Sequence, residues 1–195
     1  MSEDAVSEEA VSEGLDWLKG ETVLVAGGRI SGLAAVVPLR ELGAEVVVTD
    51  SDPDAIEAAR SVGAAGVRQD ELLADEAMLD RIALVVTSPG FRPDAPVLAA
   101  AAQRGIPIWG DVELAWRVDR AAIYGPPAKW LVVTGTNGKT TTTSMLASIL
   151  SSAGLPSAAC GNIGLPILDA LRATPHPTVL AVELSSFQLF WAPSV

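Results

Sequence analysis

The stretch from Val132 to Thr143 constrains the fold most, because an apolar strand there runs into a short glycine loop that opens a helix. Gly135 and Gly138 permit backbone conformations and close approaches that a side chain would block, so successive N–H groups can converge on phosphate oxygens. These donors also lie at a helix N-terminus, where partial positive charge favours an anion. The stretch therefore predicts a phosphate-binding loop.

The residues that follow the loop carry its chemistry. Lys139 is placed to reach the β- and γ-phosphates of a nucleotide, and the hydroxyl of Thr140 is placed to coordinate Mg²⁺. The usual loop has a glycine five residues before the one that precedes the lysine, and here that position is Val133. The loop is thus a shortened variant, Gly-x-x-Gly-Lys-Thr. The alternative is a Gly/Thr-rich turn with a surface lysine, which we weigh less because strand, loop and helix occur in the order that the mechanism needs.

The composition of the 195 residues indicates a globular protein, with 49% hydrophobic and 19% charged residues. A net charge of -11 argues against nucleic-acid binding, since a phosphate backbone needs an excess of basic surface. No positively charged start with an apolar run indicates a signal peptide, and no apolar stretch approaches the ~20 residues that span a bilayer. We expect a cytoplasmic protein that does not bind membranes.

The single cysteine and the single histidine carry little functional signal. Cys160 excludes an internal disulfide framework and is interpreted as a small buried hydrophobe. His176 lies between two prolines, which predicts a solvated loop residue without a metal or catalytic role.

The first half of the chain alternates apolar strands with helical segments, which predicts a parallel sheet covered on both faces. The turn after the first strand resembles a Gly-x-Gly-x-x-Gly dinucleotide fingerprint, but Arg29 replaces the middle glycine. Asp50 ends the second strand, where such folds place an acid on a sugar hydroxyl. A tight turn with a helix cap is an equally open interpretation of Asp50. The predicted strands are 22–26, 46–49, 82–87 and 106–109, and the predicted helices are 33–42, 52–62, 95–104 and 111–117, the last begun by an Asp111 cap.

The segment Gly125-Pro126-Pro127 has the composition of a stiff linker and predicts a domain boundary. We expect an α/β protein with an acidic flexible lead over 1–20, a Rossmann-like parallel-sheet nucleotide-binding domain over 21–125, and the first part of a P-loop ATPase-type α/β domain over 126–195. In this second part the helix from Lys139 follows the loop, and a strand over 179–182 delivers Glu183. A carboxylate at the end of a strand beside the phosphate loop is where a metal-holding acid is expected.

Five motifs together resemble the Mur ligase family, and the resemblance runs from about Thr22 to Val195. They are Ser-Pro-Gly at 88–90, Gly-Asp-Val-Glu-Leu at 110–114, Thr-Gly-Thr-Asn-Gly-Lys-Thr-Thr at 134–141, Gly-Asn-Ile-Gly at 161–164 and Glu-Leu-Ser-Ser-Phe-Gln-Leu at 183–189. The resemblance implies an ATP-dependent amide ligase of peptidoglycan synthesis. It would add D-glutamate to UDP-N-acetylmuramoyl-L-alanine through an acyl phosphate, with Mg²⁺, as a monomer.

Alternatives remain open within and outside this class. The chain could instead be another Mur ligase, a folylpolyglutamate-synthase-like ligase, or a non-catalytic module that binds a UDP-sugar. Because family members are longer, the resemblance also implies that the chain is an amino-terminal portion that would not turn over by itself.

The resemblance further implies roles for individual residues. Lys139 and Glu183 would serve catalysis, and Thr140 and Glu183 would hold Mg²⁺. ATP would be contacted by Gly135, Thr136, Asn137, Gly138, Lys139, Thr140 and Thr141. The UDP-substrate would be contacted by Ile30, Ser31, Asp50, Ser51, Gly90 and Asn162. Two positions depart from the family pattern: Arg29 replaces a glycine, and Asp52 stands where relatives offer a basic residue. How the protein would bind the diphosphate on that side therefore stays open.

Overall fold

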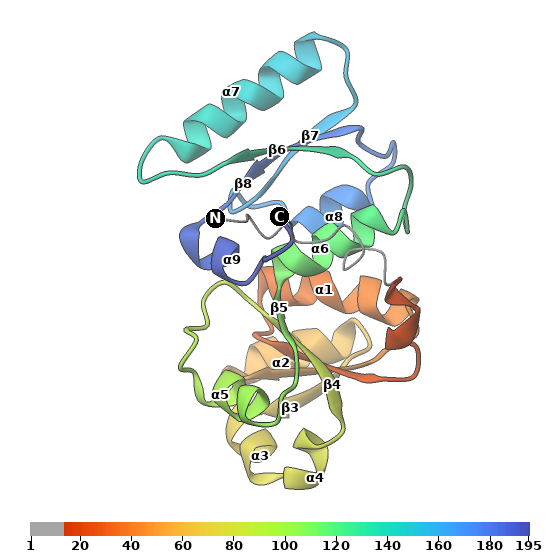
Figure 1. Cartoon of the computed structure of the whole chain (residues 1–195), viewed down its shortest axis with the longest axis vertical. Helices are drawn as coiled ribbons and strands as arrows, with labels where there is room; N and C mark the ends of the chain where they lie inside the picture. Colours follow the sequence, from red (N-terminus) through yellow and green to blue (C-terminus); the bar gives the residue numbers. More distant parts are fainter. Residues whose placement is uncertain (1–13) are drawn as a thin grey trace, which may run out of the picture.

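The computed structural model describes residues 14–195, which form two parallel β-sheets with helices against their faces (Figure 1). The first sheet has five strands in the order β3-β2-β1-β4-β5. Its strands are β1 (Thr22–Ala26), β2 (Glu45–Asp50), β3 (Ala65–Arg68), β4 (Ile82–Thr87) and β5 (Ile108–Gly110). The order of winding reverses between β1 and β4, and open α/β sheets bind ligands at such a point. The predicted parallel α/β fold is confirmed.

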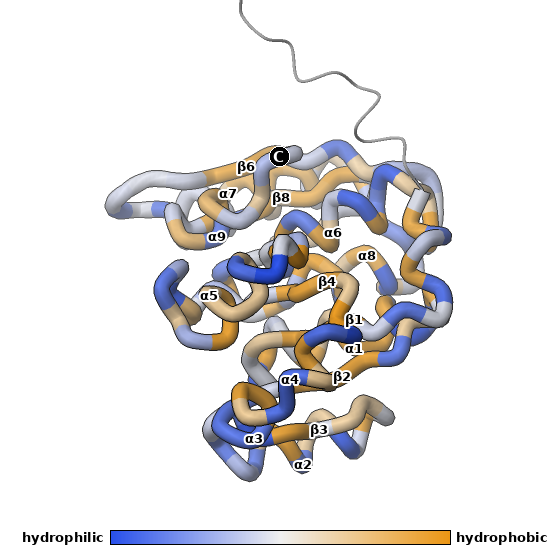
Figure 2. The backbone as a smooth tube through the Cα atoms, turned by 60° about the horizontal axis from the view of Figure 1, so that its bottom comes forward, coloured by the Kyte–Doolittle hydropathy of each residue, from blue (hydrophilic) through white to orange (hydrophobic). Residues whose placement is uncertain are grey.

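Alternate residues of the first sheet face two different layers of helices. Val23 and Val25 pack in one cluster with α1 (Ile30–Glu41), α2 (Pro53–Ser61) and α6 (Asp111–Arg120). Leu24 packs in another cluster with α3 (Gln69–Ala74), α4 (Glu76–Leu79) and α5 (Pro96–Gln103). Burial on both faces explains the apolar runs within the central strands, Val46 to Val48 in β2 and Ile82 to Val86 in β4, which are coloured as hydrophobic in Figure 2.

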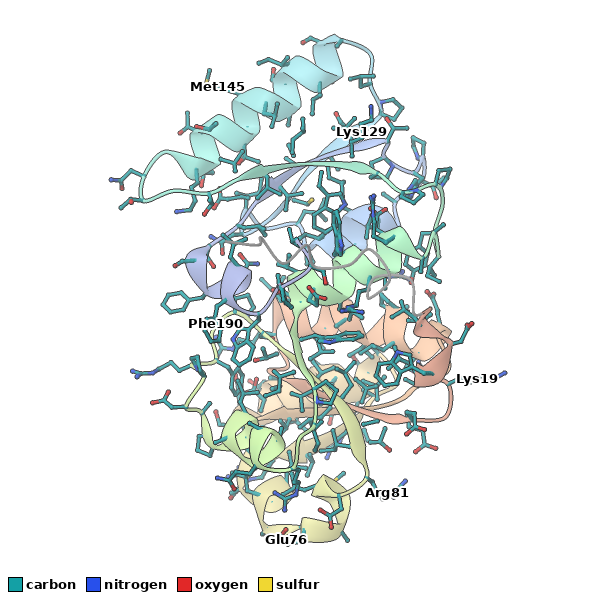
Figure 3. The ribbon with its side chains drawn as sticks, in the orientation of Figure 1. Lys19, Glu76, Arg81, Lys129, Met145 and Phe190 are labelled. Carbon is teal, nitrogen blue, oxygen red and sulfur yellow. The ribbon has the colours of Figure 1, made fainter. Side chains whose placement is uncertain are left out.

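The second sheet has three parallel strands in the order β6-β8-β7. They are β6 (Lys129–Val133), β7 (Ser157–Gly161) and β8 (Val179–Glu183), and the helices are α7 (Lys139–Ser152), α8 (Ile167–Leu171) and α9 (Ser186–Phe190). Ala181 packs toward Leu150 of α7, and Leu180 packs in the cluster that includes α8. Met145 points away from the sheet on the outer side of α7 (Figure 3) and is 61% exposed.

One hydrophobic core joins the two sheets. The helices α1, α6 and α8 lie between them (Figure 1), and their buried residues belong to a single cluster that also holds side chains of β1 and β8. Cys160 is fully buried in this cluster, and burial raises the pKa of its thiol to about 12, which confirms its interpretation as a buried hydrophobe. The two sheets therefore share a packed core through α1, α6 and α8.

The connection from α6 to β6 is fixed by polar contacts. The buried carboxylate of Asp119 accepts hydrogen bonds from Ala128 N at 3.0 Å and Trp130 Nε1 at 2.9 Å. His176 lies in a loop, as predicted, but it is not fully solvated. Its ring is half-buried, with Nδ1 2.9 Å from Leu171 O and Nε2 3.1 Å from Pro126 O, because residues 174–178 fold back against the connection.

Several predicted elements are corrected by the structure. The segment between the predicted helix 52–62 and the strand 82–87, for which no element was predicted, contains β3, α3 and α4. The strand β3 gave little sequence signal because it is a half-exposed edge strand with one β-branched residue, Val67. The cap of α6 is Gly110 and not Asp111, which is the first residue inside the helix. Within the predicted flexible lead, Leu15–Leu18 form a 3₁₀ turn whose two leucines are buried, and residues 1–13 lie outside the described residues. No helix within residues 14–195 is both long and apolar enough to cross a membrane.

Candidate nucleotide-binding sites

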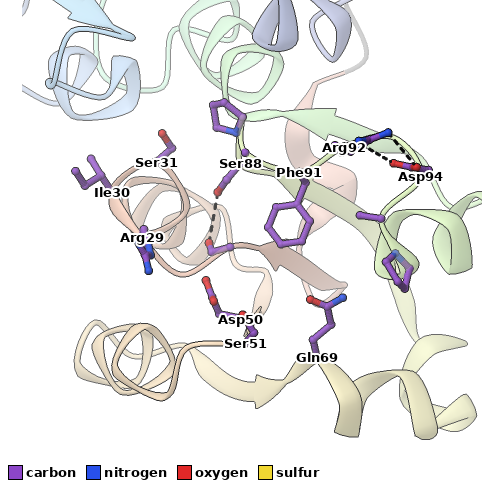
Figure 4. A pocket seen from close by; sticks show the side chains of 15 residues that line it. Arg29, Ile30, Ser31, Asp50, Ser51, Gln69, Ser88, Phe91, Arg92 and Asp94 are labelled. Atoms are coloured by element: carbon purple, nitrogen blue, oxygen red, sulfur yellow. Dashed lines mark hydrogen bonds and ion pairs between the residues drawn. The ribbon is translucent and has the colours of Figure 1, made fainter.

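The larger cavity lies at the point where the winding of the first sheet reverses. It has a volume of about 950 Å³ and is lined by the segments that follow β1, β2 and β4 (Figure 4). All five residues of this region that were predicted to contact the substrate line it, namely Ile30, Ser31, Asp50, Ser51 and Gly90. A volume of this order suits a nucleotide-sized ligand. The structure thus brings together the first predicted set.

The turn between β1 and α1 is held tightly against its neighbours. A Cβ at Gly32 would lie 1.8 Å from Gly27 O, so only glycine lets the helix start so close to the strand. The carboxylate of Asp50 accepts from Gly28 N at 2.8 Å and Asp52 N at 2.9 Å. Asp50 therefore ties this turn to the one after β2, and the helix cap in that turn is Asp52, whose side chain accepts from Asp54 N.

The rim of this cavity carries charge while its wall is partly apolar. Arg29 forms an ion pair with Asp52 at 3.3 Å on one side. On the other side, Arg92 pairs with Asp94 at 3.0 Å (Figure 4). The ring of Phe91 lies between these two sides. A ligand with an aromatic base and an anionic tail matches such a lining.

The second cavity, of about 370 Å³, surrounds the glycine loop at the end of β6. Its lining consists of Thr136, Asn137, Gly138, Lys139, Thr140, Thr141, Asn162 and Glu183. Gly138 has a left-handed backbone, with φ of 77°, and forms the N-cap of α7, so that the amides of the helix start face the cavity. Lys139 Nζ donates to Gly135 O at 2.8 Å, which folds the ammonium over the loop. Six of the seven predicted ATP-site residues line this cavity, whereas Gly135 does not and contacts it only by accepting the hydrogen bond from Lys139.

Glu183 is the most unusual residue of the second cavity. It is 2% exposed, and its Oε1 accepts from Asn162 Nδ2 at 3.1 Å. Its Oε2 is buried without a hydrogen-bond partner within residues 14–195. An unpartnered buried carboxylate oxygen is costly unless a cation or donor satisfies it, and Mg²⁺ prefers oxygen ligands. Together with the Thr140 hydroxyl, this residue fits the predicted metal.

The predicted metal ligands are few. Within the described part of the chain, no group of three or more His, Cys, Asp and Glu side chains could hold a metal ion. Mg²⁺ in phosphoryl-transfer sites often keeps one or two protein ligands and takes the rest from phosphate and water. One hydroxyl and one carboxylate agree with that mode of binding.

Asp111, which the sequence analysis noted as a helix cap and as part of the Gly-Asp-Val-Glu-Leu motif, lines neither cavity but has partners in both halves of the chain. Burial raises the pKa of its carboxyl to about 6, against hydrogen bonds from Val112 N, Ser31 and Gln188 that favour the charged form. Ser31 lines the larger cavity, and Gln188 belongs to the capping box that begins α9 just after β8. No local pattern could reveal this role, because its partners come from opposite halves of the chain.

Comparison with known proteins finds similarity over most of the chain. Residues 21–110 match the family described as Mur ligase MurD-like, N-terminal domain, and residues 133–190 match the Mur ligase middle domain. The UDP-N-acetylmuramoylalanine--D-glutamate ligase of Rhodococcus jostii is 66% identical over 183 residues, covering 93% of this chain and 37% of the relative. The enzymes of the same name from Nocardia farcinica and Mycobacterium tuberculosis are 63% and 53% identical, covering 93% and 90% of this chain and 37% and 34% of their own lengths.

The two matched segments contain both cavities, from the β1 turn to α9. The chain spans about 37% of the length of the first relatives it matches. The chain belongs to the Mur ligase family.

Proposed function

We propose that this chain supplies the UDP-substrate site and the phosphate loop of an ATP-dependent ligase that adds D-glutamate to UDP-N-acetylmuramoyl-L-alanine in peptidoglycan synthesis. The observation that carries the proposal is the second cavity, where the loop amides, Lys139 and the unpartnered oxygen of Glu183 converge. The names of the relatives support the substrates. A cytoplasmic, monomeric enzyme is part of the proposal.

The chain's own groups suit the transfer of a phosphoryl group to a carboxylate. The amides at the start of α7 and the Lys139 ammonium would stabilise negative charge on the transferred group, after Lys139 exchanges Gly135 O for a phosphate oxygen. Mg²⁺, when bound, would neutralise charge on the phosphates between Thr140 and Glu183. Asn162 would keep Glu183 oriented through its 3.1 Å hydrogen bond while contacting the substrate.

The product of that transfer is an acyl phosphate, which the amine of D-glutamate attacks to give an amide and inorganic phosphate. This chemistry needs no protein nucleophile, so the rate acceleration would come from positioning the reactants and stabilising the charge of the transition state. The role proposed for the larger cavity is to hold the uridine diphosphate end of the same substrate.

A chimera tests the proposal. This chain replaces the matched 183 residues of the Rhodococcus jostii ligase, and ADP release is measured with UDP-N-acetylmuramoyl-L-alanine and D-glutamate. We expect release that requires both substrates. We also expect Lys139→Ala to lower it about a hundredfold or more, and the matched control Lys129→Ala, at the other end of β6, to leave it unchanged.

Two outcomes would contradict the proposal. Wild-type release in Lys139→Ala would exclude the phosphate-loop mechanism. A folded chimera that binds the UDP-substrate without releasing ADP, while the Rhodococcus parent is active, would favour the non-catalytic binding module.

A further inference from the structure

Four charged side chains line the larger cavity, and they differ in how many of their hydrogen-bonding groups already have a partner. They are Arg29, Asp50, Arg92 and Asp94. Both oxygens of Asp50 accept main-chain N–H groups, from Gly28 and Asp52. Arg92 binds Asp94 in a two-point contact, Nε to Oδ1 at 3.0 Å and Nη2 to Oδ2 at 3.3 Å. Arg29 makes one contact within residues 14–195, from Nη2 to Asp52 Oδ2 at 3.3 Å. The guanidinium of Arg29 therefore keeps most of its donors open.

Arg29 stands where the nucleotide fingerprint expects glycine, yet its backbone is unstrained. Its φ of -96° and ψ of -160° are those of extended chain, which any residue adopts. The position thus tolerates a side chain, and this one is 78% exposed at the cavity rim. A guanidinium there remains accessible to a ligand.

The main chain around Arg29 adds donors to the same place. Arg29 is the N-cap of α1, and the first intrahelical bond runs from Leu33 N to Arg29 O at 2.8 Å. The amides of Ile30 and Ser31 precede that bond, and these two residues line the cavity. A planar guanidinium beside a helix N-terminus matches the oxygens of a phosphate group.

Asp52 keeps the guanidinium at the rim. Its Oδ1 caps α2 by accepting from Asp54 N at 3.1 Å, so its Oδ2 has a fixed position facing Arg29. In the free protein this pairing also neutralises the Asp52 charge, which would otherwise repel an anion entering the cavity.

We propose that Arg29 binds the diphosphate of the uridine nucleotide substrate, with Asp52 as its resting partner. This inference rests on the proposed function, since it names the residue that recognises the charged part of the same ligand. The two residues that depart from the family pattern, Arg29 and Asp52, would then act together, since they form one ion pair at the rim of the cavity.

The test is a titration of the full 195-residue chain with UDP and, separately, with uridine, which lacks phosphate. We expect Arg29→Gln to weaken UDP binding about tenfold or more, the scale of a charge-assisted hydrogen bond, and to leave uridine binding unchanged. Arg29→Lys, which keeps the charge without the planar fork, should recover part of the loss. The matched control is Arg81→Gln, because Arg81 pairs with Glu45 at 3.6 Å outside the cavity and points to solvent (Figure 3).

The outcomes separate this inference from the proposed function. Equal UDP affinity of Arg29→Gln and wild type would overturn the inference alone. Equal weakening of UDP and uridine would overturn it too, because Arg29 would then contact the base. Absence of UDP binding by the wild-type chain would overturn both. Thermal unfolding of each variant checks that the fold is retained.

Discussion

At the scale of single residues, two buried glutamates have opposite relations to their surroundings. Glu183 has one hydrogen-bonded oxygen and one that is buried without a partner, whereas both oxygens of Glu113 are satisfied. Glu113 accepts from Arg117 Nε at 2.7 Å and from Ser194 Oγ and N at 2.7 and 3.0 Å. A buried charge is costly when unpaired and hard to replace when paired, so the two positions should respond differently to the same change.

For Glu183→Gln we expect unchanged or higher stability, by up to about 1 kcal/mol, because the change removes an unsatisfied buried charge. The free energy of unfolding from urea denaturation measures it. The variant should also lose any stabilisation of the chain by Mg-ATP. A loss of more than about 1 kcal/mol would contradict the interpretation of Glu183 as an unsatisfied buried carboxylate that awaits a metal ion.

For Glu113→Gln we expect a loss of about 2–4 kcal/mol, because an amide NH₂ would face the donors of Arg117 or Ser194. The same urea titration measures this free energy, and the pair of variants controls for the Glu-to-Gln change itself. A neutral result would mean that the contact with Ser194 contributes little in solution.

Local sequence was sufficient for some site residues and insufficient for others. Lys139 and Thr140 could be predicted because the loop, strand and helix that position them are contiguous. Glu183 needed only the strand that ends there. The roles of Arg29 and Asp111 could not be predicted, because their partners are fixed by packing between elements that are distant in the chain.

At the scale of elements, the connection between α6 and β6 is a polar cluster rather than a free linker. Asp119 is 4% exposed and accepts from Ala128 N, Trp130 Nε1 and Arg120 Nη2. The composition of Gly125-Pro126-Pro127 predicted a stiff segment, but not the carboxylate that binds its far end.

Asp119→Asn should therefore lower stability by about 3 kcal/mol, since its amide would present N–H groups to donors that need an acceptor. The free energy of unfolding from urea denaturation measures this loss. Asp169→Asn, on the half-exposed surface of α8, is the matched control, with an expected change of about 0.5 kcal/mol or less. Equal effects of the two variants would contradict the structural role of Asp119.

At the scale of the whole molecule, Asp111 joins the two halves that carry the two cavities. Because burial raises the pKa of its folded-state carboxyl to about 6, the folded protein binds this proton more tightly than the unfolded chain. Its contribution to stability is full below about pH 4 and is lost as the pH rises through about 6.

Asp111→Asn cannot lose a proton, so it should become more stable relative to wild type as the pH rises from 4 to 7, by about 1–3 kcal/mol. Chemical denaturation of both proteins at each pH measures this difference. A difference that stays constant across the range would contradict the titration of Asp111 in the folded state.

The arrangement of the halves was the part of the fold that sequence could not predict. Apolar strands such as 22–26 and 82–87 indicated two-sided burial and a parallel sheet, which the structure confirms. They did not indicate that α1, α6 and α8 share one core between the two sheets. An apolar pattern predicts that a face is buried, but it does not predict which element packs against that face.

The most direct test of the larger cavity as the UDP-substrate site is a calorimetric titration of the 195-residue chain with UDP-N-acetylmuramoyl-L-alanine. We expect saturable binding at one site, competed by UDP and weakened by Arg29→Gln. An absence of binding by a folded chain, or binding that UDP does not compete, would contradict the assignment of the larger cavity as the UDP-substrate site.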